Sequence, residues 1–360
     1  MKEERIRILK MVEEGKITVD EALNLLEQLE QNQGSSTTHF EEAKKEDTVH
    51  QKLQSTKDKI FEFVDTAIKK IKEVDFDFNF GQSVEISHIF HQGNVVPREI
   101  DIDIANGSVH IIPWDQQDVR VECKAKVYRA ENEDQARQNF LKDASFSIEG
   151  AKLRFTTQQK WMKVDTLLYV PQAEYERVRV RLFNGPISGD NMKVEDLKVK
   201  TANGKINFTT VSGKKVEVET ANGQIKMMNS FVDHIEAETI NGTIKLDGDF
   251  RKAELESFNG NLLTNLFGNR CESFSAKATT GAIDLYVPKD LGVHGKIKTN
   301  LGGINVLLDG IEILDEKNEM VQKNLRFQSV NHSESLLKIF AETKTGSVTI
   351  HQGDGVTPFK

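Results

Sequence analysis

One phrase, repeated at a near-constant period, limits what this chain can fold into. A strand-like segment ends in Asn-Gly, and the dipeptide recurs in the same phase at Asn106, Gly107, Asn184, Gly185, Asn203, Gly204, Asn222, Gly223, Asn241, Gly242, Asn259 and Gly260. From Gly185, successive steps to the next copy are 19, 19, 19, 18, 21 and 21 residues, with the last two copies ending at Gly281 and Gly302. Such a period indicates stacked copies of one supersecondary unit.

Within each copy, apolar and polar residues alternate, which is typical of a strand with one buried face. Asn and Gly both tolerate positive φ, so the pair is expected to turn the chain. Two architectures fit: a single-stranded β-solenoid with Asn-Gly at a corner, and an antiparallel meander in which Asn-Gly closes hairpins. We favour the solenoid, because an even period is expected of repeat architectures. The predicted fold class is therefore mainly β.

The array has a less regular beginning and end. A copy at 100–111 places its start near residue 85, and Asp75–Phe80 has the alternation of a first edge strand. Gly107 and Gly185 are 78 residues apart, which predicts about four intervening periods, interrupted by a helix that Asn132 caps. The phase is lost after Ile304 and returns at 337–348. The predicted repeat domain spans residues 75–360.

Three segments precede this domain. Residues 1–32 predict two short amphipathic helices, 33–48 a flexible linker, and 49–74 an amphipathic helix with an apolar face of Leu53, Ile60, Val64, Ala67, Ile68 and Ile71. Two short helices bury little surface alone, so residues 1–32 are expected to self-associate or bind a protein partner. Packing on their own β domain is the alternative. Helix 49–74 is expected to cap the open end of the array.

Composition excludes several classes of protein. A net charge of −8 argues against a nucleic-acid binder, and two cysteines argue against a disulfide-rich extracellular scaffold. The chain opens with a charged segment, and no apolar run is long enough to span a bilayer. The expected location is the cytoplasm. A membrane-peripheral position, anchored by helix 49–74, is the alternative.

Motifs that carry chemistry are missing from the sequence. It has no phosphate-binding glycine loop, no Gly-x-Ser-x-Gly nucleophile elbow and no Cys-x-x-Cys or His-Glu-x-x-His metal spacing. We therefore predict no catalytic residue, no cofactor and no metal ion. The expected function is that of a non-enzymatic scaffold or interaction protein.

One pattern on the outward side of the strands suggests a binding surface. The residues six and four positions before each glycine form two outward columns, and six consecutive members are acidic: Glu217, Glu219, Glu236, Glu238, Glu254 and Glu256. An unbroken acidic block favours a cationic partner. A plain solvated face is the simpler interpretation. The rival from another class is a glycoside-cleaving β-helix enzyme that uses paired glutamates as acid and base.

These features resemble the YvlB-like proteins of Gram-positive bacteria. Residues Glu13 to Leu26 are similar to their short SHOCT-like helical domain, and the repeats resemble their adhesin-type domain of unknown function. The resemblance implies a β-solenoid fold and says little about activity. It also implies a link to cell-envelope stress proteins and a membrane-associated partner.

Overall fold

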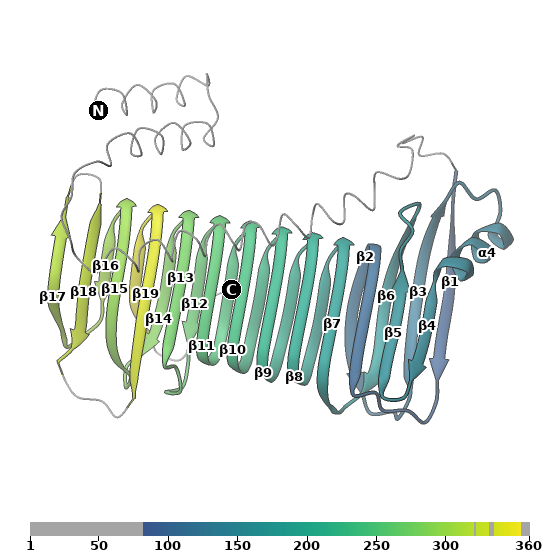
Figure 1. Cartoon of the computed structure of the whole chain (residues 1–360), viewed down its shortest axis with the longest axis horizontal. Coiled ribbons are helices and arrows are strands. Elements are labelled where there is room, and N and C mark those ends of the chain that lie inside the picture. Colours follow the sequence, from purple (N-terminus) through teal and green to yellow (C-terminus); the bar gives the residue numbers. More distant parts are fainter. Residues whose placement is uncertain (1–81, 320–321, 331–334, 354–360) are drawn as a thin grey trace, which may run out of the picture. The chain divides into compact units, whose positions relative to one another are not determined.

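The computed structural model describes residues 82–319, 322–330 and 335–353. Its centre is a run of strands that lie side by side in sequence order (Figure 1): β7 Glu174–Asn184, β8 Ile187–Asn203, β9 Ile206–Asn222, β10 Ile225–Asn241 and β11 Ile244–Asn259. Each pairs with the next in parallel, so that Thr201 lies beside Thr220 and Thr220 beside Thr239. The predicted β-solenoid is confirmed, and the antiparallel meander is wrong for these strands.

Each coil has two limbs that share one core. The first limb ends at Asn-Gly and the second begins two residues later, and both bury every second side chain. In the coil that contains Gly223, Val216 and Val218 come from the first limb and Ile225 and Met227 from the second, and all four are fully buried in one hydrophobic cluster. The alternation read from the sequence therefore lines both walls of the solenoid.

The Asn-Gly corner needs glycine both for space and for backbone conformation. None of its asparagines has a positive φ, whereas Gly107, Gly185 and Gly260 have φ values of 143°, 131° and 158°. A Cβ on Gly223 would overlap the carbonyl oxygen of Gly204, and a Cβ on Gly204 would overlap that of Gly185. Successive coils thus approach each other through a column of glycines, and the positive φ expected from the sequence occurs at three of these glycines but at no asparagine of the corner.

The asparagine side chains form a ladder along the same corner. Each amide nitrogen donates to the amide oxygen of the preceding coil: Asn184 to Asn106 at 2.7 Å, Asn203 to Asn184 at 2.9 Å, Asn222 to Asn203 at 2.8 Å, Asn241 to Asn222 at 2.8 Å and Asn259 to Asn241 at 3.0 Å. Stacked coils that place identical side chains in register permit such a ladder. The ladder explains why this position is asparagine in every central coil.

A second corner holds the left-handed residues. Asn191, Thr210 and Asn229 have φ values of 53°, 57° and 50°, and each lies six residues after the glycine of its coil. Asparagine tolerates this region, whereas a β-branched threonine is strained there. This corner separates the second limb of one coil from the first limb of the next.

The N-terminal end departs from sequence order. Its elements are β1 Ser83–Gln92, β2 Glu99–Trp114, β3 Val119–Tyr128, α4 Glu133–Asp143, β4 Ser145–Glu149, β5 Lys152–Thr157 and β6 Met162–Pro171. Strand β2 pairs on one side with β5 and β6 and on the other with β7 and β8. Asn106 and Asn184 are therefore direct neighbours, and the four periods predicted between them are wrong. Residues 115–171 instead form an outer excursion.

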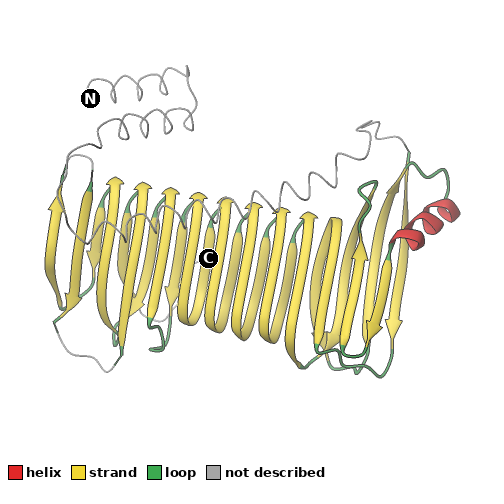
Figure 2. Cartoon of the chain, in the orientation of Figure 1, coloured by secondary structure: helices red, strands yellow, loops and turns green. Residues whose placement is uncertain are grey.

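Helix α4, drawn in red in Figure 2, lies at this end against β1 and β3. The sequence predicted its N-cap, and Asn132 Oδ1 accepts from the Gln135 backbone N–H at 2.9 Å. Ala136 and Phe140 of this helix are fully buried. The helix covers the apolar surface of the excursion.

The C-terminal end departs from sequence order in the same way. Its strands are β12 Leu262–Leu266, β13 Ser273–Thr280, β14 Ile283–Pro288, β15 Gly292–Leu301, β16 Ile304–Leu307, β17 Ile311–Asn318, β18 Lys323–Ser329, β19 Leu336–Thr345 and β20 Val348–Gly353. Strand β19 lies between β13 and β15, and β20 lies between β14 and β16. The last coil in the sequence thus separates two earlier coils. An antiparallel pair, β17 and β18, follows β15.

The expected helices in 1–32, linker 33–48, helix 49–74 and edge strand 75–80 lie outside the described residues. Among the residues that are described, no helix is both long enough and apolar enough to cross a membrane.

Candidate functional site

The six glutamates lie in register on the outer face of β9, β10 and β11. Glu217, Glu236 and Glu254 are neighbours in one column, and Glu219, Glu238 and Glu256 in the other. We call the first set column one and the second set column two. Parallel pairing keeps the columns straight, because each coil adds one strand spacing of about 4.8 Å. The three-by-two arrangement follows directly from the repeat.

Lysines from neighbouring coils border this acidic face. Lys198 and Lys215 both form ion pairs with Glu217, Lys200 pairs with Glu219 at 2.5 Å, and Lys277 pairs with Glu256 at 3.1 Å. Three of the six carboxylates are therefore compensated by cations at the edges of the face.

His234 lies beside the remaining members of column one. Its Nε2 atom is 3.4 Å from Glu236 Oε1 and 3.6 Å from Glu254 Oε1, and this buried nitrogen makes no hydrogen bond. A buried polar atom without a partner costs free energy. Glu236 and Glu254 thus share one imidazole and have no lysine partner among the described residues. The uncompensated negative charge of column one is concentrated on them.

Members of the two columns differ in exposure. The ion-paired side chains are largely covered, with 15% of Glu217, 15% of Glu219 and 16% of Glu256 exposed. The two glutamates beside His234 are more open, with 35% of Glu236 and 50% of Glu254 exposed. A partner in solution can therefore reach Glu236 and Glu254 more readily than the ion-paired members.

The surroundings of Glu217 perturb its acidity. Burial on its own raises the pKa of this carboxyl group. The hydrogen bonds from Lys198 and Lys215 outweigh burial, and the pKa falls to about 2. The bond to Glu217 in turn raises the pKa of Lys215. This ion-paired cluster stays charged at neutral pH and stiffens the edge of the face.

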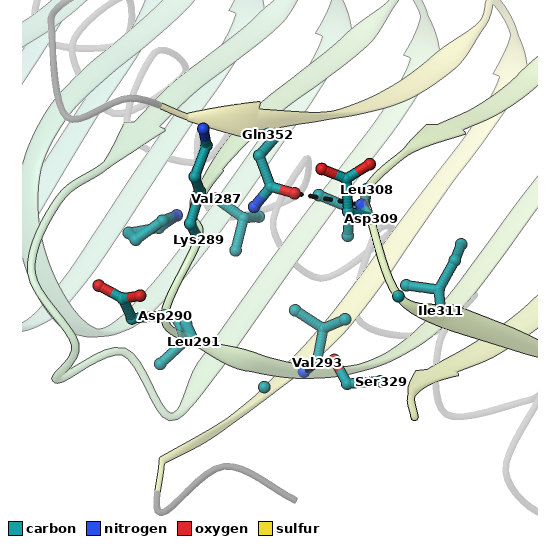
Figure 3. A pocket seen from close by; sticks show the side chains of 13 residues that line it. Val287, Lys289, Asp290, Leu291, Val293, Leu308, Asp309, Ile311, Ser329 and Gln352 are labelled. Atoms are coloured by element: carbon teal, nitrogen blue, oxygen red, sulfur yellow. Dashed lines mark hydrogen bonds between the residues drawn. The ribbon is translucent and has the colours of Figure 1, made fainter. Parts of the chain in front are cut away.

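Glycoside cleavage requires two carboxyl groups that enclose a sugar between them. The glutamates lie instead on the outer face of a sheet, and three of them are ion-paired to lysine. A hollow of about 170 Å³ lies elsewhere, at the C-terminal end of the array. Figure 3 shows its lining, where Gln352 Oε1 accepts from the Asp309 backbone N–H at 3.1 Å.

Metal binding has no support in the described part of the chain, where no group of three or more His, Cys, Asp or Glu side chains could hold an ion. Both cysteines are buried, and burial raises the pKa of Cys123 and of Cys271 to about 12. Each behaves as a small apolar residue.

The C-terminal border of the acidic face does not follow sequence order. Counting back from Gly281 and Gly302 would put Lys277 and Lys298 side by side in column two, but Glu342 of β19 lies between them. In column one, Phe340 separates Ser275 from Lys296 for the same reason. His234 was not predicted as part of this face, because it belongs to a third outward column. Its position two residues before Glu236 was the available signal.

The family was identified by comparison with known proteins. A model of the Toastrack DUF4097 family matches residues 97–351, and a model of the SHOCT-like domain matches residues 3–34. The chain is 46% identical over 360 residues to the "Uncharacterized protein YvlB" of Bacillus subtilis strain 168, covering 97% of this chain and 99% of that one.

Solved structures with similar folds share little sequence. One, described as a "putative adhesin" of Bacteroides fragilis, is 11% identical with a TM-score of 0.38, covering 75% of this chain and 97% of that one. Another with the same description, from Parabacteroides distasonis, is 9% identical with a TM-score of 0.37, covering 73% and 97%. The match over 97–351 decides the assignment: this chain belongs to the Toastrack DUF4097 family and carries a SHOCT-like match at its N-terminus.

Proposed function

We propose that this protein is a non-enzymatic scaffold that binds a basic segment of a protein partner along column one of the acidic face. The observation that carries the proposal is the pair Glu236 and Glu254, which are half-exposed and share a single imidazole between them. A row of carboxylates held at fixed spacing by a rigid sheet attracts lysine and arginine side chains.

Ionic pairing at the edges supports recognition rather than general attraction. Lys198 and Lys277 bound the acidic block on both sides, so a cationic segment gains favourable contacts only over the three central coils. Like-signed edges reject a misplaced basic segment, which is a common source of specificity.

The SHOCT-like segment supplies a second contact in this proposal. Residues 1–32 associate with a partner or with a second copy, while the β array presents the acidic face. A membrane-associated protein of the cell-envelope stress response is the partner class that the family resemblance implies, and a cytoplasmic location follows from the same proposal.

The test is binding of a short lysine-rich peptide to the full-length chain. The double variant Glu236→Gln and Glu254→Gln is expected to weaken binding at low salt by about tenfold, which corresponds to roughly 1.4 kcal/mol. Glu312→Gln, on the exposed strand β17, is the matched control and is expected to leave binding unchanged. Equal affinities of all three proteins would contradict the proposal. Release of reducing sugar from an oligosaccharide panel by the wild-type chain would favour the glycosidase instead.

A further inference from the structure

A strip of apolar residues crosses the outer face beside column two. It consists of the residues two positions before each glycine: Phe183, Ala202, Ala221, Ile240 and Phe258. Registered pairs on both sides, such as Thr220 with Thr239 and Asn222 with Asn241, place these residues in one straight column. We call this column the outer strip. It is an apolar row on a face that otherwise carries charges.

The alanines of the outer strip are buried and lie outside the hydrophobic core cluster. Ala202 and Ala221 are 1% and 4% exposed, yet neither belongs to the hydrophobic core cluster. Their inward neighbours explain why. Thr201 and Thr220 point into the solenoid and donate to the carbonyl oxygens of Gly185 and Gly204 at 3.2 Å. The next residue along each strand therefore faces outward.

We propose that residues 49–74 of the same chain form the amphipathic helix that docks on the outer strip. The sequence predicts this helix and gives it an apolar face. The helix would then cover the outer face of the array, and not its open end as expected from the sequence. This docking does not depend on partner binding at Glu236 and Glu254.

The lengths of the two surfaces agree. Five side chains at one strand spacing of about 4.8 Å span about 19 Å. Ile60 to Ile71 on a helix rises about 17 Å at 1.5 Å per residue. The small alanines at Ala202 and Ala221 leave room for branched side chains between the bulkier ends of the strip, Phe183 and Phe258.

The charges agree as well. At 3.6 residues per turn, Lys59 and Lys70 fall on the same flank of the apolar face, about three turns apart. Column two lies directly beside the outer strip, and its middle members are Glu219, Glu238 and Glu256. A helix that lays its apolar face on the strip brings these lysines over the carboxylates.

The experiment measures how fast a maleimide alkylates a cysteine introduced at Ala221 in the full-length chain. Cys123 and Cys271 give little background, because burial keeps both thiols protonated. The reference is Asn207→Cys, because Asn207 is exposed on the second limb of the coil that contains Gly204. We expect Ala221→Cys to react at least about tenfold more slowly than this reference, since reaction requires local opening.

Variants of the helix supply the decisive comparison. Ile60→Glu with Ile68→Glu, placed in the Ala221→Cys background, is expected to raise the rate to that of the reference. Lys59→Glu with Lys70→Glu is expected to raise it by about threefold, because only ion pairs are lost. Lys69→Glu, on the side of the helix opposite the apolar face, is the matched control and leaves the rate unchanged. Circular dichroism of each variant verifies that the β array is intact.

A photoreactive residue in place of Ile240 identifies the occupant independently. A crosslink to a peptide within 49–74 of the same chain supports the proposal. Crosslinks between differently labelled copies would assign the strip to a second molecule instead. Alkylation of Ala221→Cys at the reference rate in the otherwise unchanged chain would overturn the proposal.

Discussion

Between Glu174 and Asn259 each coil pairs with the coil that follows it in the sequence, whereas at both ends a distant segment lies between consecutive coils. Strand β2 separates β5 and β6 from β7 and β8, and the coil of β19 and β20 separates the coil of β13 and β14 from that of β15 and β16. The centre is thus held by near-neighbour contacts, and the ends by contacts between residues far apart in the chain.

The same local feature marks both departures. Tyr169 of β6 packs against Trp114 of β2 with ring centroids 5.2 Å apart, and Tyr286 of β14 packs against His351 of β20 at 4.4 Å. Each tyrosine lies in a Leu-Tyr-Val-Pro segment, and each aromatic partner lies on the strand that enters out of order. The centre and the ends therefore differ in how neighbouring coils are fixed. In the regular centre, pairing between successive coils is sufficient, whereas each coil that enters out of order makes an aromatic contact with its neighbour.

The largest contrast is expected from glycine. Gly223→Ala places a Cβ on the carbonyl oxygen of Gly204. Because the overlapping atoms belong to the backbone of the preceding coil and cannot rotate away, the free energy of unfolding should fall by about 3 kcal/mol or more. Gly303→Ala, at the C-terminal end, meets nothing within 4 Å and serves as the control. Urea unfolding of both variants measures the difference. Similar midpoints would show that the coils are not held as closely as the structure indicates.

A smaller contrast is expected along the asparagine ladder. Asn222 donates to Asn203 and accepts from Asn241, whereas Asn259 ends the ladder and the residue in register with it in the next coil is Thr280. Asn222→Ala should lower the free energy of unfolding by about 1–2 kcal/mol, a modest loss because these amides are close to solvent. Asn259→Ala should lower it by about half as much, because Asn259 ends the ladder. Thermal unfolding of the two variants tests the order. A greater loss for Asn259→Ala would reverse the assignment of centre and edge.

The smallest contrast is one of pH. Glu217, in the centre, has a pKa lowered to about 2, so its ion pairs stabilise the fold above its unfolded pKa, and this stability is lost as pH falls towards 2. Asp143, at the N-terminal end, has a pKa raised by burial despite hydrogen bonds from backbone N–H groups, so its contribution is lost as pH rises.

Glu217→Gln should therefore flatten the acid limb of the stability profile and lower stability at neutral pH by about 1 kcal/mol, after allowance for solvent screening. Asp143→Asn should change stability at neutral pH in the opposite direction. Urea unfolding between neutral and acidic pH gives both profiles. Parallel profiles for the two variants and the wild type would contradict the assigned ionisation.

The centre of the fold was predictable because its information is local. Strict alternation and a fixed phase defined which side chains of β8 to β11 face inward, and the acidic grid followed from counting back from each glycine. Even the capping of α4 by Asn132 was visible. Those predictions needed only residues within one period of each other.

The ends were not predictable, because their order depends on which strand fills which position. Nothing within the segment of Asn106 says that Asn184, rather than the next segment in the sequence, will be its neighbour. For the same reason Glu342 could not be placed beside Lys277. The close approach of the glycines was also not predictable, since it leaves no mark on the residues next to them in the sequence.

The position of the coil formed by β19 and β20 has a consequence for how the protein is made. Residues 336–353 fill the space between two coils that the ribosome has already released, and both of those coils bond to it along their whole first limb. Domains made from the N-terminus generally begin to fold during synthesis. Here the coils of β13 with β14 and of β15 with β16 acquire their native neighbour only after residues 336–353 have been translated. A nascent chain stalled before this point exposes two unpaired strand edges, and so differs from the finished molecule in a way that a protease or chaperone can detect.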